Sequence, residues 1–152
     1  MTGIVHPDVR FVAPDTLPWV EGGGMKLRVL RVDIDENIWV IENKFSPGFT
    51  APGHKHTGKV DAFTLSGRWH YLEYLIDYEA GSYVYEPANS VHTLHVPADN
   101  SGETHVIFVM QGANLNLDAD GNVESVTDAV SILAAYEYMC EAQGFGTPTV
   151  LR

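Results

Sequence analysis

Two histidines stand one residue apart in a glycine-bounded segment, and this spacing could hold a metal ion. His54 and His56 lie in PGHKHTG, just before a run of strand-forming residues. On an extended strand, side chains two positions apart point to the same face, with roots about 7 Å apart. Two imidazoles placed in this way can converge on one ion. The pair alone is a weak signal, so the surrounding spacing matters.

A second glycine-bounded segment supplies a third imidazole. The segment GFTAPGHKH has the spacing G-x5-H-x-H, and GSYVYEP further along has the spacing G-x5-P. His92 follows the proline of the second segment by five residues. Neutral imidazoles bind Fe(II), Zn(II), Ni(II) and Cu(II) alike, so the ligand type does not select the metal. We predict that His54, His56 and His92 hold one divalent metal.

Short strand-like runs separated by turn residues make up most of the chain around these histidines. The runs are rich in Val, Ile, Tyr, Phe, Trp and Thr, and Gly, Pro, Asn and Asp separate them. They cover residues 26–33, 37–45, 61–66, 68–76, 82–87, 91–97 and 104–112. Many short strands at this spacing predict a β-sandwich or barrel. Asp120-Gly121 predicts one further hairpin turn.

The last part of the chain changes to a helical period. Apolar residues recur at helical spacing within residues 125–144, where Ser125 or Thr127 could cap the start and Gly144 could end the helix. The prediction is one mainly β domain over the whole chain, with one C-terminal α-helix. Its parts are an N-terminal arm over 1–25, a barrel core over 26–112, and a hairpin plus helix over 113–152.

Composition narrows the classes of partner. The 152-residue chain has a formal net charge of −11, which argues against binding nucleic acid or an anionic membrane surface. Its one cysteine, Cys140, cannot form an intrachain disulfide. The sequence shows no signal peptide and no apolar run long enough to span a membrane. We expect a cytoplasmic protein in which Cys140 is a buried or inert thiol.

The two histidine segments together resemble the motifs of the cupin superfamily. GFTAPGHKHTGKVDAFTLSG and GSYVYEPANSVHTLHV follow the two cupin motifs over roughly residues 26–112. The resemblance implies a double-stranded β-helix, or jelly-roll, barrel with metal ligands in its mouth. HKHTGKVDAFTLSGRWHYLEY, AGSYVYEPANSVHTL and DADGNVESVTDAV resemble 2,4′-dihydroxyacetophenone dioxygenase and its relatives, and acetylacetone-cleaving dioxygenase is a more distant relative.

This resemblance implies an activity. Those enzymes are small, oligomeric, iron-dependent cupins that use O2 to cleave a C–C bond next to a carbonyl. It implies that His54, His56 and His92 bind Fe(II), with Zn(II) or Ni(II) as alternatives in the purified protein. We expect a small, aryl or other, hydroxyketone or diketone as substrate, O2 as co-substrate, and a homodimer or homotetramer.

The chain departs from the cupin motifs at its acidic ligand. Val60 stands in the place of the acid, and Asp61 beside it must face the other way on a strand. We expect the carboxylate from GRWHYLEY, where Trp69, Tyr71 and Glu73 share one strand face. If that face points inward, Glu73 joins the histidines as a further ligand or as the base; if not, His70 enters and Glu73 is exposed.

Two smaller departures concern the second motif, and aromatic residues are candidates for the pocket wall. Asn89 replaces the motif glycine, and asparagine tolerates the left-handed backbone of a tight turn. Val96 replaces the final asparagine. Core packing is the alternative role for each aromatic candidate. The predicted substrate-pocket residues are Trp39, Phe63, Trp69, Tyr71 and Tyr85.

Three other functions remain open at this level. One is a zinc-binding sensor or regulatory cupin of the anti-sigma-factor type, in which a helical partner-binding domain would precede the barrel; about twenty-five residues precede the first expected strand here. Another is a metal-dependent isomerase or small-molecule binder without O2 chemistry. The last is a structural cupin without metal, which three motif histidines in register disfavour.

Overall fold

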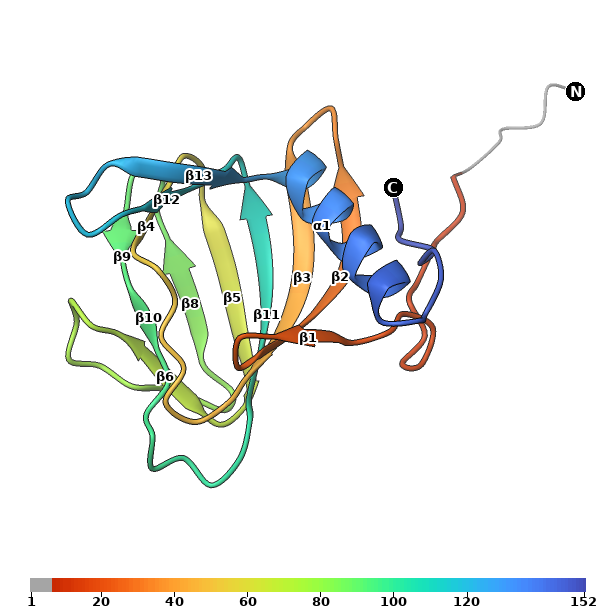
Figure 1. The fold of residues 1–152 in the computed structure, drawn as a ribbon. Helices are drawn as coiled ribbons and strands as arrows, with labels where there is room; N and C mark the ends of the chain where they lie inside the picture. The colour runs from red at the N-terminus through yellow and green to blue at the C-terminus, as the bar shows by residue number, and fades with distance from the viewer. Residues whose placement is uncertain (1–6) are drawn as a thin grey trace, which may run out of the picture.

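The computed structural model describes residues 7–152, which form facing β-sheets with one helix at the C-terminal end (Figure 1). The mainly β jelly-roll prediction is confirmed. All strand pairs are antiparallel. The large sheet has, in spatial order, β1 (Val20–Gly22), β2 (Met25–Asp33), β3 (Ile38–Phe45), β11 (Thr104–Gln111), β5 (Val60–Ser66) and β8 (Tyr83–Glu86).

Two smaller sheets lie opposite the large one. One contains β13 (Val123–Thr127), β12 (Asn114–Leu117), β4 (His54–His56) and β9 (Val91–His92). The other contains β10 (Leu94–His95), β6 (Arg68–Tyr71) and β7 (Tyr78–Glu79). The hairpin predicted at Asp120-Gly121 joins β12 to β13. The histidines of β4 and β9 therefore face the inner surface of the large sheet across the barrel interior.

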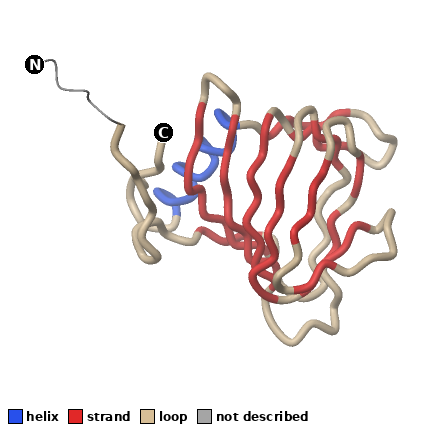
Figure 2. Tube along the Cα trace, turned by 180° about the vertical axis from the view of Figure 1, so that it is seen from behind, coloured by secondary structure: helices blue, strands red, loops and turns tan. Residues whose placement is uncertain are grey.

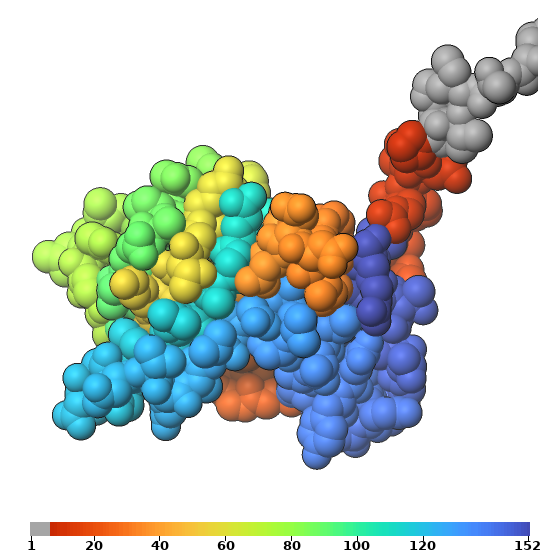
Figure 3. All heavy atoms as spheres, turned by 90° about the horizontal axis from the view of Figure 1, so that it is seen from above, coloured from red at the N-terminus to blue at the C-terminus, as the bar shows by residue number. Residues whose placement is uncertain are grey.

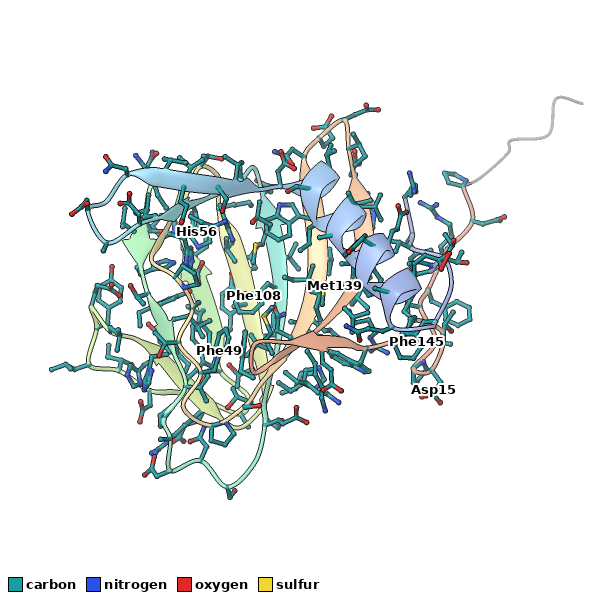
Figure 4. All side chains as sticks on the ribbon, viewed as in Figure 1. Asp15, Phe49, His56, Phe108, Met139 and Phe145 are labelled. Carbon is teal, nitrogen blue, oxygen red and sulfur yellow. The ribbon has the colours of Figure 1, made fainter. Side chains whose placement is uncertain are left out.

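Strand alternation builds the core between the sheets. On β11, Val106, Phe108 and Met110 point inward and are buried, while the intervening residues are half-buried on the outer face. Burying every second side chain on one face is what period-two alternation predicts. Figure 4 shows Phe49, His56 and Phe108 inside the barrel. The core and the candidate site thus share one interior.

The turn at Gly67 fixes where β6 begins. Gly67 has a φ of +77°, and a Cβ on it would lie 2.4 Å from the side chain of Thr104. Only glycine fits both demands at low cost. The strand that follows ends at Tyr71, so the predicted strand over 68–76 is too long. The extra residues form a turn and a loop before β7.

The helix α1 (Ala129–Ala142) begins one residue after a capping aspartate. The Asp128 carboxylate accepts from the Ser131 N–H, and the Ser131 hydroxyl accepts in return from the Asp128 N–H. This capping box replaces the predicted caps, Ser125 and Thr127, because the strand β13 continues to residue 127. The helix buries Leu133 and Tyr136 and packs beside β1 and β2.

The described part of the N-terminal arm runs beside the C-terminal segment (Figure 3). Arg10 donates to the carbonyl of Arg152, and Tyr136 donates its phenol O–H to the carbonyl of Pro18 at 2.5 Å. Residues 1–6 of the predicted arm lie outside the described residues. Within residues 7–152, no helix has both the length and the apolar character needed to cross a bilayer.

Candidate metal centre

Two paired strands bring the three predicted histidines together. His54 and His56 lie on β4, and His54 is the direct cross-strand partner of His92 on β9. The turn before β9 contains Asn89, whose φ of 69° is left-handed, as its replacement of the motif glycine predicts. The Asn89 N–H donates to the carbonyl of His56, which ties this turn to β4. The local ladder therefore sets all three imidazoles on one inner surface.

The ring nitrogens of these histidines converge. One ligand nitrogen from each of His54, His56 and His92 lies within 4.8 Å of the other two. The Nε2 atoms of His56 and His92 are 3.0 Å apart, and both residues are 2% exposed. Burial removes water as a competing partner for these lone pairs. The structure therefore places the predicted histidines as a compact set of three nitrogen donors.

Glu86 supplies the carboxylate beside this set. Its Oε2 atom lies 2.8 Å from Nε2 of His56 and 3.6 Å from Nε2 of His92, with the side chain 3% exposed. Its Oε1 atom accepts the phenol O–H of Tyr71. The Tyr71 ring stacks on the His92 ring, with centroids 3.7 Å apart. Tyr71 thus orients both Glu86 and His92.

The register of β5 and β8 explains how Glu86 reaches the histidines. Val60, which occupies the expected place of the motif acid, is the direct cross-strand partner of Glu86. Asp61 faces the outer surface, where it accepts the phenol O–H of Tyr83, as the one-residue shift predicts. The missing carboxylate therefore comes from the neighbouring strand. In SYVYEP, Glu86 lies two residues after the apolar Val84, so both side chains share the inner face of β8. This alternation is the sequence signal that would have identified Glu86.

The expected placement of Glu73 is wrong. The face of Trp69 and Tyr71 points inward, as favoured, but β6 ends at Tyr71, and Glu73 falls in the following turn, exposed. Its carboxylate accepts the backbone N–H of Thr93 at 2.8 Å. Burial is the largest single influence and raises the pKa of Glu73, but the hydrogen bonds, chiefly from Thr93, together outweigh it, so the net shift of the pKa is downward. Glu73 caps the backbone of the neighbouring strand instead of entering the histidine cluster.

Electrostatics favour a neutral imidazole at His54 and an ionised carboxylate at Glu86. Burial, with repulsion from His56, lowers the pKa of His54 from 6.5 to about 4, so this imidazole is neutral near pH 7. Burial alone would raise the pKa of Glu86, but the close approach of the His56 and His92 imidazoles outweighs burial and lowers the pKa. The site therefore combines a neutral imidazole with an ionised carboxylate.

An apolar cavity of about 230 Å³ opens onto the histidines. Aliphatic and aromatic side chains form most of its wall, including Trp39, Ile41, Phe49, Leu94, Phe108 and Met110. The polar lining residues are His54, His56, Tyr71 and Glu86, together with Asn43, Asn114, Asn116 and Thr127. No lysine or arginine lines this cavity within residues 7–152. Its size and character suit a small uncharged organic molecule.

Only part of the predicted aromatic wall lines the cavity. Trp39 and Tyr71 do so. Trp69 is fully buried in the core, where its indole N–H donates to the Thr64 hydroxyl. The prediction that Phe63 and Tyr85 line the pocket is wrong. Side chains alternate between the two faces of a strand, and both residues lie on the exposed outer face. Aromatic character alone does not show which face of a strand a residue occupies.

The donor set fits a divalent metal. Oε2 of Glu86 is buried and lacks an aligned hydrogen-bond donor although two imidazole nitrogens lie close to it. An orphaned carboxylate oxygen beside three convergent nitrogens is the arrangement expected around a cation. Histidine and carboxylate donors suit Fe(II), Zn(II) and Ni(II). His54, His56 and His92 would hold the ion, with Glu86 beside it.

Comparison with known proteins agrees with this geometry. The family model described as "ChrR Cupin-like domain" matches residues 8–114. The chain belongs to the ChrR cupin-like family. No curated protein matches the sequence. A solved protein of unknown function with a cupin-like fold from Ralstonia eutropha JMP134 is 33% identical, with a TM-score of 0.89 over 98% of this chain and 96% of its own.

Two further structures share this cupin fold. An RmlC-like cupin protein, also from Ralstonia eutropha JMP134, is 23% identical, with a TM-score of 0.87 over 95% of each chain. An acetylacetone dioxygenase from Acinetobacter johnsonii is 15% identical, with a TM-score of 0.76 over 91% of this chain and 97% of its own. At these identities the likeness shows the fold alone.

Proposed function

We propose that this cupin is a non-haem Fe(II) dioxygenase that cleaves a C–C bond next to a carbonyl. The observation that carries the proposal is the set of three convergent imidazoles and one orphaned carboxylate beside a cavity whose other described lining residues carry no charge. The acetylacetone dioxygenase among the structural neighbours supports this choice of reaction class. The proposed substrate is a small α-hydroxyketone or β-diketone, of an aryl or alkyl kind.

The reaction balances with O2 as the only co-substrate. An α-hydroxyketone would give two carboxylic acids, one of them formic acid when the hydroxyl carbon is terminal, and a β-diketone with an unsubstituted central carbon would give a carboxylic acid and a 2-oxoaldehyde. One oxygen atom of O2 enters each product as the C–C bond breaks. Fe(II) held by His54, His56 and His92 would supply Lewis acidity and O2 activation.

The protein side chains bind the substrate and move its proton. Glu86, ionised and held by the Tyr71 phenol, accepts the proton that the ketone loses on forming its enolate. Trp39 and Phe108 exclude water from the enolate. The absence of a lysine or arginine among the described lining residues favours neutral ketones over substrates that carry a carboxylate.

The test is O2 uptake by protein loaded anaerobically with Fe(II). We expect uptake in a one-to-one ratio with at least one α-hydroxyketone or β-diketone, and 18O from labelled O2 in both products. The Zn(II)-loaded protein is the matched control and should consume no O2. Iron-loaded protein that consumes no O2 with any member of either class would contradict the proposal, and turnover without O2 would indicate an isomerase.

A metal-binding regulatory role is the second candidate. The family match to the ChrR cupin-like domain favours it, as does one neighbour at a TM-score of 0.50 whose title describes a complex of SigE with the anti-sigma ChrR from Rhodobacter sphaeroides. A structural zinc site needs no substrate space, whereas this site opens onto a cavity of about 230 Å³. Zinc bound at one per chain after anaerobic purification, with no O2 uptake once zinc is replaced by iron, would favour the regulatory role.

A further inference from the structure

The outer face of the large sheet is divided into a polar half and an apolar half. On the polar half, Arg28 and Glu42 are cross-strand partners joined by a buried ion pair of 2.5 Å, and Trp19 of the arm covers Arg28. The apolar half covers β5, β8 and β11 from Ile107 onward, and Figure 2 shows this face turned toward the viewer with no helix across it. At the start of β11, Trp19 of the arm contacts His105.

Cross-strand register arranges the apolar half in rows. Tyr83 on β8 pairs with Phe63 on β5, and Phe63 pairs with Ile107 on β11. The next row contains Tyr85, Asp61 and Val109. Phe63 is 43% exposed, Tyr83 57% and Tyr85 56%, although all three are large aromatic side chains. Scattered exposed apolar residues are ordinary, but a contiguous exposed cluster marks an interaction surface.

The exposed area is of the size that forms the centre of a dimer interface. With Leu65, which is 49% exposed, the aromatic side chains leave roughly 400 Å² of apolar surface. A stable interface buries roughly 800 Å² on each partner, of which the apolar patch is the core and a polar rim the rest.

Charge and symmetry favour a second copy of this chain as the partner. Copies with a net charge of −11 repel each other, so they can meet only where carboxylates are scarce. The patch has one carboxylate, Asp61, and its charge is partly satisfied by the Tyr83 phenol. We propose that two copies pack face to face about a two-fold axis that runs parallel to β5 between the two sheets, so that β8 of each copy lies over β11 of the other. Phe63 then meets its own counterpart near the axis.

The test is the oligomeric state of the full chain, measured by sedimentation over a range of concentrations. We expect wild type at twice the chain mass of 16.8 kDa, or a multiple of that dimer. Phe63→Lys should weaken self-association at least about 100-fold, because it places like charges on the axis. Mixing Phe63→Lys with Phe63→Glu should restore the dimer. Tyr138→Ser, which removes an exposed aromatic from the helix instead, is the matched control and should leave the dimer intact.

Hydroxyl-radical footprinting of wild type tests the same face without any substitution. We expect Phe63, Tyr83 and Tyr85 to be protected at high protein concentration and labelled on dilution, with Tyr138 labelled throughout. A wild-type monomer at roughly 100 µM, or an oligomer that Phe63→Lys leaves unchanged, would overturn the proposal. A patch that is labelled equally at every concentration would also overturn it and would point to a different protein as the partner.

Discussion

Two groups of histidines on the same barrel differ in what their ring nitrogens contact. In the inner group, the Nε2 atoms of His56 and His92 lie 3.0 Å from each other, and Oε2 of Glu86 lies beside them. In the outer group, His70 and His95 are also cross-strand partners, with ring centroids 5.3 Å apart. There, Nδ1 of His70 lies 3.0 Å from an Asp77 oxygen, and Nδ1 of His95 lies 2.7 Å from the Thr50 hydroxyl.

The difference shows that proximity of imidazoles is not enough for a metal site. The outer pair is partly exposed, and each ring already has a hydrogen-bond partner. The inner group is more deeply buried, has a third imidazole and has a carboxylate with an unsatisfied oxygen. A buried carboxylate oxygen without a hydrogen-bond donor is costly, and its position beside three imidazole nitrogens is the arrangement expected of a metal site.

Removing one inner imidazole should have the largest effect. His56→Ala should lower the metal affinity by more than about 100-fold, because the loss of a direct ligand exceeds the usual loss of a supporting residue. His95→Ala is the matched control from the outer pair and should keep full metal content. Metal analysis of both variants after anaerobic purification checks this. Equal metal content in the two variants would remove the distinction between the groups.

The second largest effect should be a difference in turnover between variants of the two carboxylates, Glu86 and Glu73. Glu86→Gln should reduce turnover by about 10² to 10⁴ with metal content retained, because the amide cannot accept the substrate proton. Glu73→Gln should change turnover less than about twofold, since that carboxylate caps the Thr93 N–H. Steady-state rates with metal analysis of each variant test the assignment. A larger loss in Glu73→Gln than in Glu86→Gln would return the catalytic role to Glu73.

The depressed pKa of His54 predicts a pH dependence in the metal-free protein. His54 has a pKa of 6.5 in the unfolded chain and of about 4 in the folded protein. As the pH falls between these two values, the unfolded chain therefore binds a proton at His54 that the folded protein does not bind. The free energy of unfolding should therefore fall over that window, by on the order of 2 kcal/mol from this residue. Urea unfolding of metal-free wild type and His54→Gln between pH 7 and pH 4.5 measures it. If the free energy of unfolding changed with pH equally in both proteins, burial would not perturb the pKa of this imidazole.

The outer pair should give the smallest effect. His70→Ala should lower the free energy of unfolding by less than about 1 kcal/mol, because its pairing with Asp77 is partly exposed. Metal content and turnover should be unchanged. Chemical unfolding and metal analysis of the same preparation test this. Loss of the metal in His70→Ala would mean that the outer histidines take part in binding.

The sequence predicted the histidines well because motif spacing and strand geometry act locally. The three imidazoles depend on one two-residue spacing and on one turn before His92, in which Asn89 has a left-handed backbone. The prediction for Glu73 is wrong because it requires β6 to continue beyond Tyr71. Tertiary contacts determine where a strand ends, and an alternating sequence pattern does not contain them. Glu86 was missed because its pairing with Val60 is a register between strands that are distant in sequence.

The same limit applies to the pocket wall and the helix. Trp39 and Phe63 are both strand aromatics, and only the register shows that one lines the cavity while the other lies on the outer face. The helix and its approximate length followed from periodicity, but its cap moved to Asp128 because β13 occupies the residues before it. Period and composition thus predicted the elements, and pairing between elements decided which side chains meet.

Anomalous diffraction at the iron edge, from crystals grown anaerobically with Fe(II), tests the central claim most directly. The account predicts one peak per chain, about 2.0 to 2.2 Å from one nitrogen each of His54, His56 and His92, with the Glu86 carboxylate beside it. No peak should lie between His70 and His95. A barrel interior without a peak, or iron bound at the outer pair instead, would contradict the account.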